Sequence, residues 1–260
     1  MDLRLKDKII AVTGGGKGIG EGIVRTLAEE GAVPIIIGRN ISDNEQTLKS
    51  ILSISPNASQ IVAELTNPEN CKKPVEWIAA RYGRIDSLVN NAGVNDGVGL
   101  ENGSYEAFLS SLHKNLIHYY LLAQHCLPYL KQSRGSIVNI SSKTAETGQG
   151  GTSGYAASNG GRNALTREWA VELLPYGIRV NAVVVAECYT PLYQKWIATF
   201  PEPEKKLEEI NRRIPLDHRM TTESEIAAAV AFLLSDKSSH TTGQLIHVDG
   251  GYVHLDRALS

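Results

Sequence analysis

Short apolar runs alternate with longer stretches of helical periodicity along most of the chain. Residues 8–13 (KIIAVT) and 33–37 (VPIII) are apolar runs of strand length, and the segment between them repeats apolar side chains at helical spacing. Strands that are apolar at nearly every position are typical of a parallel sheet with both faces covered. The pattern therefore predicts a strand–helix–strand unit at the beginning of the chain.

The same alternation continues to residue 248. Further strands are predicted at 60–63, 87–90, 136–140, 179–185 and 245–248, and helices near 43–54, 69–82, 104–131, 153–175 and 223–235. The chain is therefore predicted to be α/β, with a single Rossmann-type doubly wound parallel sheet flanked by helices and one dinucleotide-binding catalytic domain over 1–260. Four prolines between 190 and 218 interrupt the rhythm, and we interpret residues about 187–218 as a lid-like substrate segment.

The composition excludes several kinds of partner. The 260 residues are 42% hydrophobic and 21% charged, which is too apolar for a disordered chain. The net charge is −2 and no basic block occurs, so we expect no nucleic-acid partner. No apolar run approaches the roughly 18 residues of a membrane span, and residues 9–12 are too short for a signal-peptide core. We therefore expect no membrane partner and a cytoplasmic location.

Cysteine and histidine spacing predicts neither a disulfide framework nor a metal site. Cys71, Cys126 and Cys188 are odd in number and widely spaced, and no CxxC occurs. We expect them to be small buried side chains. Five of the seven histidines, considered as candidate metal ligands, show no typical ligand spacing: His113, His118, His125, His247 and His254.

A glycine-rich loop, TGGGKGIG at 13–20, lies between the first strand and the first helix. Glycines let the backbone approach a pyrophosphate, and a helix N-terminus offers free N–H groups and partial positive charge. The spacing differs from GxGxxG, but the strand–loop–helix context predicts a dinucleotide site. Its predicted cofactor-binding residues are Gly14, Lys17, Gly18, Ile19 and Gly20.

Arg39 directly follows the second predicted strand. NAD-binding chains of this fold place an acid in this region to bind the ribose 2′-hydroxyl, whereas an arginine can pair with a 2′-phosphate. Lys17 can add a second positive charge. We therefore expect NADP, with NAD possible; the alternative is that both side chains are solvated surface cations.

Several motifs together resemble the classical short-chain dehydrogenases/reductases. They are TGGGKGIG (13–20), NNAG (90–93), Asn115, the NISS run ending at Ser142, Tyr155 and DGG (249–251). The resemblance covers essentially the whole chain. It implies a sheet of about seven strands, an NAD(P)-dependent hydride transfer at a CH–OH group, and a homotetramer.

Two hydroxyl side chains are the candidate reacting groups. Ser142 follows a predicted strand, and Tyr155 lies near the beginning of a long helix. A hydroxyl and a phenol can hold one substrate oxygen while the phenol takes or gives the proton. Asn115 resembles the family residue that holds a backbone bend and a water in a proton relay. These three residues and Asn159 are the predicted catalytic set.

The chain departs from the family pattern Tyr-x-x-x-Lys, because Asn159 stands where the lysine is expected. In the family, the lysine binds the nicotinamide ribose, and its charge favours the phenolate form of the tyrosine. Asn159 keeps the i,i+4 position relative to Tyr155 and can donate hydrogen bonds, but it carries no charge. The departure predicts an impaired enzyme or a variant that traps a complex. Lys143 is a nearby cation in the sequence.

Other cofactor contacts are implied by the resemblance. Asn91, Ala92 and Gly93 resemble the family turn beside the cofactor, and Thr190 resembles the residue that contacts the nicotinamide amide. The cofactor set also includes Tyr155 and Asn159. Val185-Ala186 stands where the family usually has Pro-Gly, which makes the following turn, with Glu187, less rigid.

Segments throughout the chain resemble bacterial L-fucose dehydrogenases of this family. They are 90–100, 115–120, 139–150, 166–173, 186–193 and 249–259. The resemblance implies oxidation of the anomeric hydroxyl of L-fucose or a related aldose to the lactone. Polar loop residues agree with a sugar, whose hydroxyls each need a partner, although any one of them can be an ordinary solvated position. The predicted substrate set is Asn95, Ser142, Lys143, Gln149, Tyr155, Glu187 and Tyr189.

Two alternatives remain at this stage. One is a reductase of a ketone or a 3-oxoacyl substrate in the same family. The other is a catalytically weak nucleotide-binding protein, which the loss of the lysine makes possible. In the lid-like segment, Tyr193 and Trp196 are candidates to stack on a sugar face, and packing within the segment is the other interpretation.

Overall fold

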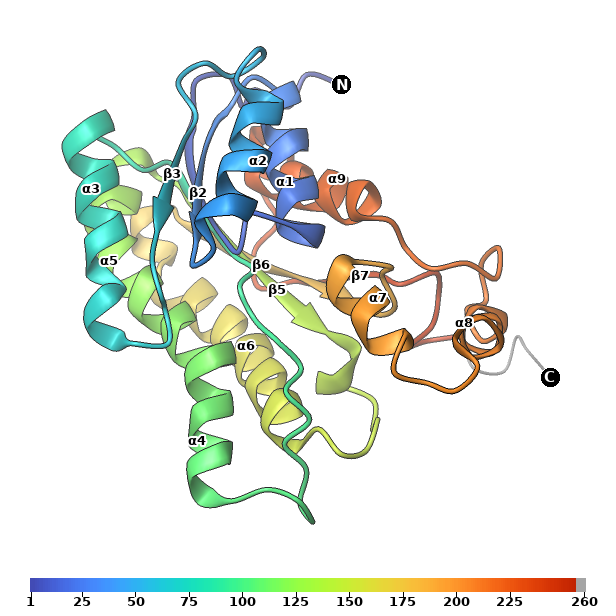
Figure 1. The fold of residues 1–260 in the computed structure, drawn as a ribbon. Helices are drawn as coiled ribbons and strands as arrows, with labels where there is room; N and C mark the ends of the chain where they lie inside the picture. The colour runs from blue at the N-terminus through green and yellow to red at the C-terminus, as the bar shows by residue number, and fades with distance from the viewer. Residues whose placement is uncertain (256–260) are drawn as a thin grey trace.

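The computed structural model describes residues 1–255, and in this part of the chain seven parallel strands form one sheet (Figure 1). The order is β3-β2-β1-β4-β5-β6-β7. The strands are β1 (Ile9–Thr13), β2 (Val33–Gly38), β3 (Ser59–Val62), β4 (Ser87–Asn90), β5 (Ser136–Ser142), β6 (Arg179–Val185) and β7 (Leu245–Val248). The predicted doubly wound parallel sheet is confirmed.

Helices cover both faces of this sheet, and Figure 1 shows α1, α2 and α9 on one side of it and α3, α5 and α6 on the other. The α-helices are α1 (Gly18–Glu29), α2 (Ile41–Ile51), α3 (Lys72–Tyr82), α4 (Tyr105–Leu112), α5 (His118–Ser133), α6 (Ser153–Glu172), α7 (Pro191–Ile197), α8 (Pro203–Arg212) and α9 (Glu223–Leu234). Short turns of other helix types are η1 (Pro68–Asn70), η2 (His113–Ile117), η3 (Lys143–Ala145), η4 (Leu174–Tyr176) and η5 (Asp236–Ser238).

The burial of β1 explains why its first four residues, Ile9 to Val12, are all apolar. Ile10 and Val12 belong to the core cluster with α1 and α9, whereas Ile9 and Ala11 belong to the cluster with α3 and α5. Side chains alternate between the two faces of a strand, and here both faces are buried. Full burial of each large aliphatic side chain contributes roughly 1.5–3 kcal/mol.

The strand order reverses direction between β1 and β4. From β1 the chain builds outward to β3 and then returns to add β4 on the other side of β1. In open α/β sheets of this kind, ligands bind outside the carboxyl ends of the strands at such a reversal. The glycine-rich loop after β1 and the NNAG segment after β4 both lie at this point.

The predicted helix near 104–131 is interrupted in the structure. It consists of α4, the π-helical turn η2 and α5, and Asn115 lies within η2. A π-helical turn inserts an extra residue into the helix and often marks a functional site. The periodicity of apolar residues did not reveal this insertion.

Residues of the predicted lid-like segment form α7 and α8 between β6 and α9. Figure 1 shows these two helices, in orange, set apart from those that cover the sheet. Ile197 of α7 is buried, whereas α8 contains no buried residue. Whether this segment acts as a lid stays a prediction. Across residues 1–255, no helix combines the length and apolar character needed to cross a membrane.

Candidate active site

The loop after β1 has a shape that only glycine permits at two of its positions. Gly14 and Gly18 have positive φ angles of 64° and 58°, which L side chains rarely adopt. A side chain at Gly20 would collide with the carbonyl oxygen of Gly14. The loop therefore closes tightly on the first turn of α1, which leaves backbone N–H groups free for a pyrophosphate.

Hydrogen bonds join this loop to the turn after β4. The hydroxyl of Thr13 accepts from the backbone N–H groups of Asn91 (2.8 Å) and Ala92 (3.0 Å). The Asn91 side-chain amide donates back to the carbonyl oxygen of Thr13 (2.9 Å). The predicted cofactor residues after β1 and β4 are thus held together at the reversal of the sheet.

Thr190 faces the same loop from the other side. A Cβ added at Gly18 would lie 3.3 Å from Thr190. The Thr190 hydroxyl accepts from the backbone N–H of Tyr193 (3.3 Å) and so caps the beginning of α7. Thr190 therefore lies between the phosphate loop and the beginning of α7.

The two candidate 2′-phosphate ligands already have acidic neighbours. Lys17 Nζ lies 2.8 Å from Asp43, and Arg39 Nη1 lies 3.7 Å from Glu64. Burial would raise the pKa of Glu64, but hydrogen bonds from Thr66 and the nearby Arg39 lower it overall. A 2′-phosphate would therefore compete with two carboxylates, and the sequence analysis did not identify either of them.

The glycine cradle and its neighbours fit a dinucleotide. The loop residues and the Asn91–Gly93 turn would hold its phosphates and ribose, with Thr190 beside the nicotinamide end. When bound, the nicotinamide accepts or gives the hydride. The fold and this loop together define a dinucleotide-binding α/β protein.

The candidate reacting groups come from β5 and α6. Ser142 ends β5, and its hydroxyl accepts from the backbone N–H of Thr144 (3.3 Å). Tyr155 lies in the first turn of α6 and is partly exposed. The Ser141 hydroxyl donates to the carbonyl oxygen of Asn159 (3.4 Å), which joins the end of β5 to α6. Both hydroxyls thus lie at the carboxyl edge of the sheet.

Asn159 is fully buried, and both polar atoms of its side-chain amide are hydrogen-bonded. Its Nδ2 donates to the carbonyl oxygen of Tyr155 (2.8 Å), one helical turn earlier. Its Oδ1 accepts from Nη1 of Arg162 (2.9 Å). The amide therefore contacts the backbone of Tyr155 and a buried arginine.

Asn115 holds together three segments of the site. Its Oδ1 accepts from the backbone N–H of Val94 (2.7 Å), and its Nδ2 donates to the carbonyl oxygen of Ser111 (3.0 Å). Its own carbonyl oxygen accepts from Nε of Arg162 (2.6 Å). The bend expected from the family resemblance is present as η2, and Arg162 is bonded to its carbonyl.

Lys143 and Glu187 form a buried ion pair at the substrate side. Their side chains are 9% and 13% exposed, and Lys143 Nζ also lies 4.0 Å from the centre of the Tyr252 ring. Burial, followed by the charge and hydrogen bond of Glu187, raises the pKa of the Tyr193 phenol far above its ordinary value. The charge of Lys143 is neutralised by Glu187.

The backbone beside Glu187 is fixed without the family proline. The carbonyl oxygen of Glu187 accepts from the backbone N–H of Thr221 (3.0 Å), and Cys188 forms a bridge with Thr221. Cys188 is buried. The segment after β6 is therefore anchored by the chain that precedes α9, which explains how Glu187 keeps its place.

Other predicted substrate residues lie on the surface. Asn95 and Gln149 are exposed on loops, and Tyr189 is 42% exposed with its ring centre 6.2 Å from that of Tyr193. The structure brings Lys143 and Glu187 together, whereas these three side chains are exposed on the surface. Within the lid-like segment, Trp196 packs edge-on against Tyr193, with ring centres 5.1 Å apart.

Three side chains without metal-ligand spacing in the sequence meet in the structure. Ligand atoms of Glu146, His247 and His254 lie within 4.8 Å of one another. Glu146 Oε2 and His247 Nε2 are 3.0 Å apart. Sequence spacing could not identify this surface group because 101 residues separate Glu146 from His247.

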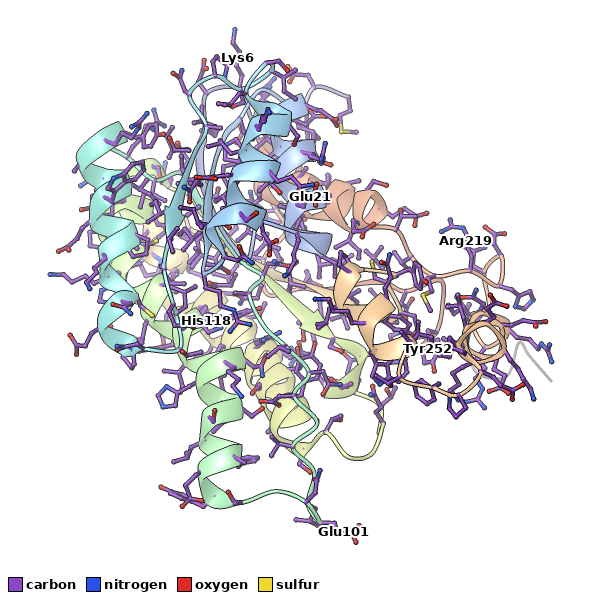
Figure 2. All side chains as sticks on the ribbon, in the orientation of Figure 1. Lys6, Glu21, Glu101, His118, Arg219 and Tyr252 are labelled. Atoms are coloured by element: carbon purple, nitrogen blue, oxygen red, sulfur yellow. The ribbon has the colours of Figure 1, made fainter. Side chains whose placement is uncertain are left out.

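His118 and the three cysteines are buried. His118, labelled in Figure 2 at the beginning of α5, is fully enclosed, and burial lowers its pKa to about 4. Cys71, Cys126 and Cys188 are free and buried. Burial raises the pKa of the Cys126 thiol to about 12. These groups are neutral near neutral pH.

Sequence reasoning did not identify two residues that shape the site. Arg162 lies on α6, seven residues after Tyr155, and is 3% exposed. Tyr252, labelled in Figure 2 near α7 and α8, covers the ammonium of Lys143. The signal for Arg162 was available, because an arginine occupies a buried position of the helical face that carries Tyr155 and Asn159.

Comparison with known proteins agrees with this geometry. Residues 14–253 match the protein family described as enoyl-(acyl carrier protein) reductase. The chain is 38% identical to the 3-oxoacyl-(acyl-carrier-protein) reductase FabG of Thermotoga maritima, with 96% of this chain and 100% of that protein covered. It is 34% identical to the L-fucose dehydrogenase of Bos taurus, with 96% and 91% covered.

Solved structures show the same architecture. Cj0485 dehydrogenase superimposes with a TM-score of 0.96 at 46% identity, covering 100% of this chain and 99% of that chain. The aldohexose dehydrogenase AldT of Thermoplasma acidophilum gives a TM-score of 0.86 at 33% identity, covering 95% and 94%. The chain belongs to the short-chain dehydrogenase/reductase family and is an NAD(P)-dependent oxidoreductase. The predicted family is thus confirmed.

Proposed function

We propose that this protein is an NADP-preferring aldose 1-dehydrogenase that oxidises the anomeric hydroxyl of L-fucose or a related aldose to the lactone. The observation that carries the proposal is the buried Lys143–Glu187 pair at the substrate side. An ammonium that donates and a carboxylate that accepts can bind adjacent sugar hydroxyls. The likeness to the L-fucose dehydrogenase of Bos taurus supports the same substrate class.

The chain's own residues account for the proton in this reaction. The hydroxyl of Ser142 holds the anomeric oxygen, and Tyr155 takes the proton from it as the C–H bond gives its hydride to the cofactor. Loss of one hydride from carbon and one proton from oxygen converts the cyclic hemiacetal to a lactone. General-base catalysis of this kind typically contributes 10²–10⁴-fold.

The preference for NADP rests on Arg39 and Lys17. Lys17 lies in the loop after β1 and Arg39 follows β2. The Arg39 side chain is 71% exposed, with only a long, 3.7 Å contact to Glu64. A doubly charged phosphate offers this guanidinium a stronger partner than a solvated carboxylate. Asn40, which caps α2, adds no negative charge next to it.

A direct test is cofactor reduction, followed spectroscopically, with a panel of aldoses and with NADP⁺ and NAD⁺ in separate series. The proposal predicts reduction with L-fucose or an aldose of the same ring stereochemistry, and a lactone as the product. It also predicts a higher kcat/KM with NADP⁺. Absence of turnover with every aldose tested would contradict it.

A second candidate is a 3-oxoacyl reductase. The 38% identity to FabG of Thermotoga maritima over the full length of that protein favours it. Oxidation of NADPH by an acetoacetyl thioester, without any sugar oxidation, would select this activity. Tight cofactor binding without hydride transfer to either substrate would instead indicate a catalytically weak nucleotide-binding protein.

We also propose a homotetramer. Helices α5 and α6 leave large apolar side chains exposed, including Tyr120 (48%) and Val171 (66%). Apolar side chains of this size are common at subunit interfaces. Sedimentation velocity tests the assembly, and a monomer at micromolar concentration would contradict it.

A further inference from the structure

Arg162 is a buried cation with no acidic partner among residues 1–255. Its side chain is almost fully enclosed, and its hydrogen bonds go to neutral oxygens only. These are the carbonyl oxygens of Asn115 (2.6 Å) and Ile140 (3.1 Å) and Oδ1 of Asn159 (2.9 Å). A buried charge is unfavourable unless it is paired, so an unneutralised guanidinium at this place requires an explanation.

The guanidinium lies on the reactive face of α6. Arg162 follows Tyr155 by seven residues and Asn159 by three, so all three share one helical face. Side chains on a helix point back toward its N-terminus, which brings the guanidinium level with Asn159. The bond from Nη1 to Asn159 Oδ1 shows that it reaches this position.

One arm of the guanidinium remains unused. Nη2 is buried and has no hydrogen-bond partner among the described residues. It lies 2.8 Å from the point that a Cβ at Gly93 would occupy. Gly93 belongs to the turn predicted to lie beside the cofactor, and the absence of a side chain there leaves room for the arginine.

We propose that the guanidinium of Arg162 supplies the fixed positive charge that the family lysine would supply at position 159. Its charge favours the phenolate form of Tyr155, and its unused arm donates to the cofactor ribose. The inference rests on the proposed role of Tyr155 and does not depend on which aldose is oxidised. Asn159 then holds the arginine in place instead of being a defect.

Lys143 is less suited than Arg162 to supply this positive charge. Its ammonium is paired with Glu187 and covered by Tyr252, so its charge is already neutralised at the substrate side. Arg162, in contrast, lies 4.3 Å from the centre of the Tyr119 ring, directly behind the cofactor turn. Of these two buried cations, only Arg162 keeps its charge available.

The groups around Arg162 permit a clear pH readout. His118 and Tyr119 face it from α5, and burial moves their pKa values to about 4 and about 12. Lys114 of η2 is paired with Asp96 (3.2 Å). His118 and Tyr119 therefore do not contribute to a change in the pH–rate profile between these limits.

The test compares three variants with the parent enzyme. Arg162→Gln removes the charge, Arg162→Lys keeps it, and Asn159→Lys combined with Arg162→Gln moves it to the family position. Arg167→Gln, an exposed arginine of the same helix, is the matched control. The readouts are the pH dependence of kcat, cofactor affinity by calorimetry without sugar, and thermal unfolding.

We expect Arg162→Gln to lower kcat roughly 10²-fold and to move the pH–rate profile to higher pH. Cofactor affinity should fall about tenfold, because a charged hydrogen bond to the ribose is lost. Arg162→Lys should recover part of both losses, and the double variant most of them. Arg167→Gln should match the parent.

A folded Arg162→Gln protein with the parent's profile and cofactor affinity would overturn the inference. If Arg162→Gln does not fold, the double variant decides: activity supports the inference. A double variant that is folded but inactive overturns the inference, and so does one that also fails to fold. In both cases the arginine at position 162 is needed for packing and not for its charge. The calorimetric arm needs no sugar, so it separates failure here from failure of the proposed substrate.

Discussion

The cofactor side and the substrate side of the cleft are built in different ways. On the cofactor side, the loop is shaped mainly by the backbone. Its shape depends on the glycines at 14, 18 and 20 and on the Thr13–Asn91 hydrogen bonds. On the substrate side, buried charges from distant segments meet, as in Lys143 and Glu187, 44 residues apart. The first design rests on backbone shape, and the second rests on paired side-chain charges.

This difference determines how each side should respond to mutation. A backbone cradle is sensitive to added volume and insensitive to charge. A buried ion pair is sensitive to the loss of either charge, because the remaining partner is left unpaired in a medium of low polarity. The following changes probe these two behaviours.

The largest effect is expected for Glu187→Gln. It leaves the ammonium of Lys143 buried without its carboxylate, which typically costs about 3–5 kcal/mol of unfolding free energy. The KM for the sugar should also rise, because an acceptor for its hydroxyls is weakened. Chemical denaturation and steady-state kinetics measure the two changes; an unaltered free energy of unfolding would show that the pair is solvated.

Gly20→Ala should lower cofactor affinity about 10²-fold, or about 2.7 kcal/mol. The added methyl group collides with the carbonyl oxygen of Gly14, so the loop must open. Gly160→Ala in α6 is the control, since an added Cβ there meets nothing within 4 Å. Calorimetric titration with NADP⁺ gives the comparison, and equal affinities in the two variants would contradict the rigid cradle.

Arg39→Ala should weaken NADP⁺ binding by about 1.5 kcal/mol, at the low end for a charged hydrogen bond, because the side chain is well solvated. NAD⁺ affinity should change little, since NAD⁺ lacks the 2′-phosphate. Glu64→Gln should do the opposite and favour NADP⁺ slightly. Equal losses for the two cofactors would remove Arg39 as the basis of the preference.

The smallest effect is expected at an exposed ion pair at the beginning of α9. Hydrogen bonds from Arg219 and from the backbone of Thr222 lower the pKa of Glu225 to about 2. Because the folded-state pKa is lowered, its contribution is present above the unfolded value of about 4.5 and is lost as the pH falls toward 2. Solvent screening limits it to about 0.5 kcal/mol.

Acid denaturation of the parent and of Glu225→Gln tests this contribution. The two curves should differ slightly above pH about 4.5 and converge toward pH about 2. The comparison with Glu187→Gln is informative because both changes remove one carboxylate of an ion pair. A loss as large as that at Glu187 would mean that burial is not what distinguishes the two pairs.

The sequence predicted the cofactor side more completely than the substrate side. Continuous apolar runs identified the strands, and Gly14, Gly18 and Gly20 identified the loop, because both signals are local. Thr190 faces Gly18, and its expected contact with the nicotinamide amide stays a prediction. The apolar pattern did not reveal the π-helical turn at Asn115, because one inserted residue hardly changes the apolar period; a bend there was expected only from the family resemblance.

On the substrate side, the residue types were recognised but their pairing was not. Lys143 and Glu187 were both predicted to contact the substrate, yet their ion pair and its cover by Tyr252 depend on the folded chain. Asn159 was interpreted as the loss of a charge. Arg162 changes this interpretation, because it carries a positive charge one turn further along the same helix and is hydrogen-bonded to Asn159.

These two interpretations of Asn159 predict opposite results for a single substitution. If Asn159 were a defect, Asn159→Lys alone would raise the rate. If Arg162 supplies the charge, the new lysine introduces a second buried cation beside the first, and like charges at close range destabilise each other. We therefore expect Asn159→Lys alone to lower thermal stability without increasing the rate.

Binding of L-fucose to the complex with NADPH shows whether the Lys143–Glu187 pair binds a sugar, because the reduced cofactor cannot accept a hydride and the sugar is not consumed. Titration calorimetry of the parent and of Glu187→Gln gives the two affinities. The account predicts measurable binding to the parent and at least tenfold weaker binding to Glu187→Gln, equivalent to about 1.4 kcal/mol. No binding of the sugar to the parent complex, or equal affinity in both proteins, would contradict it.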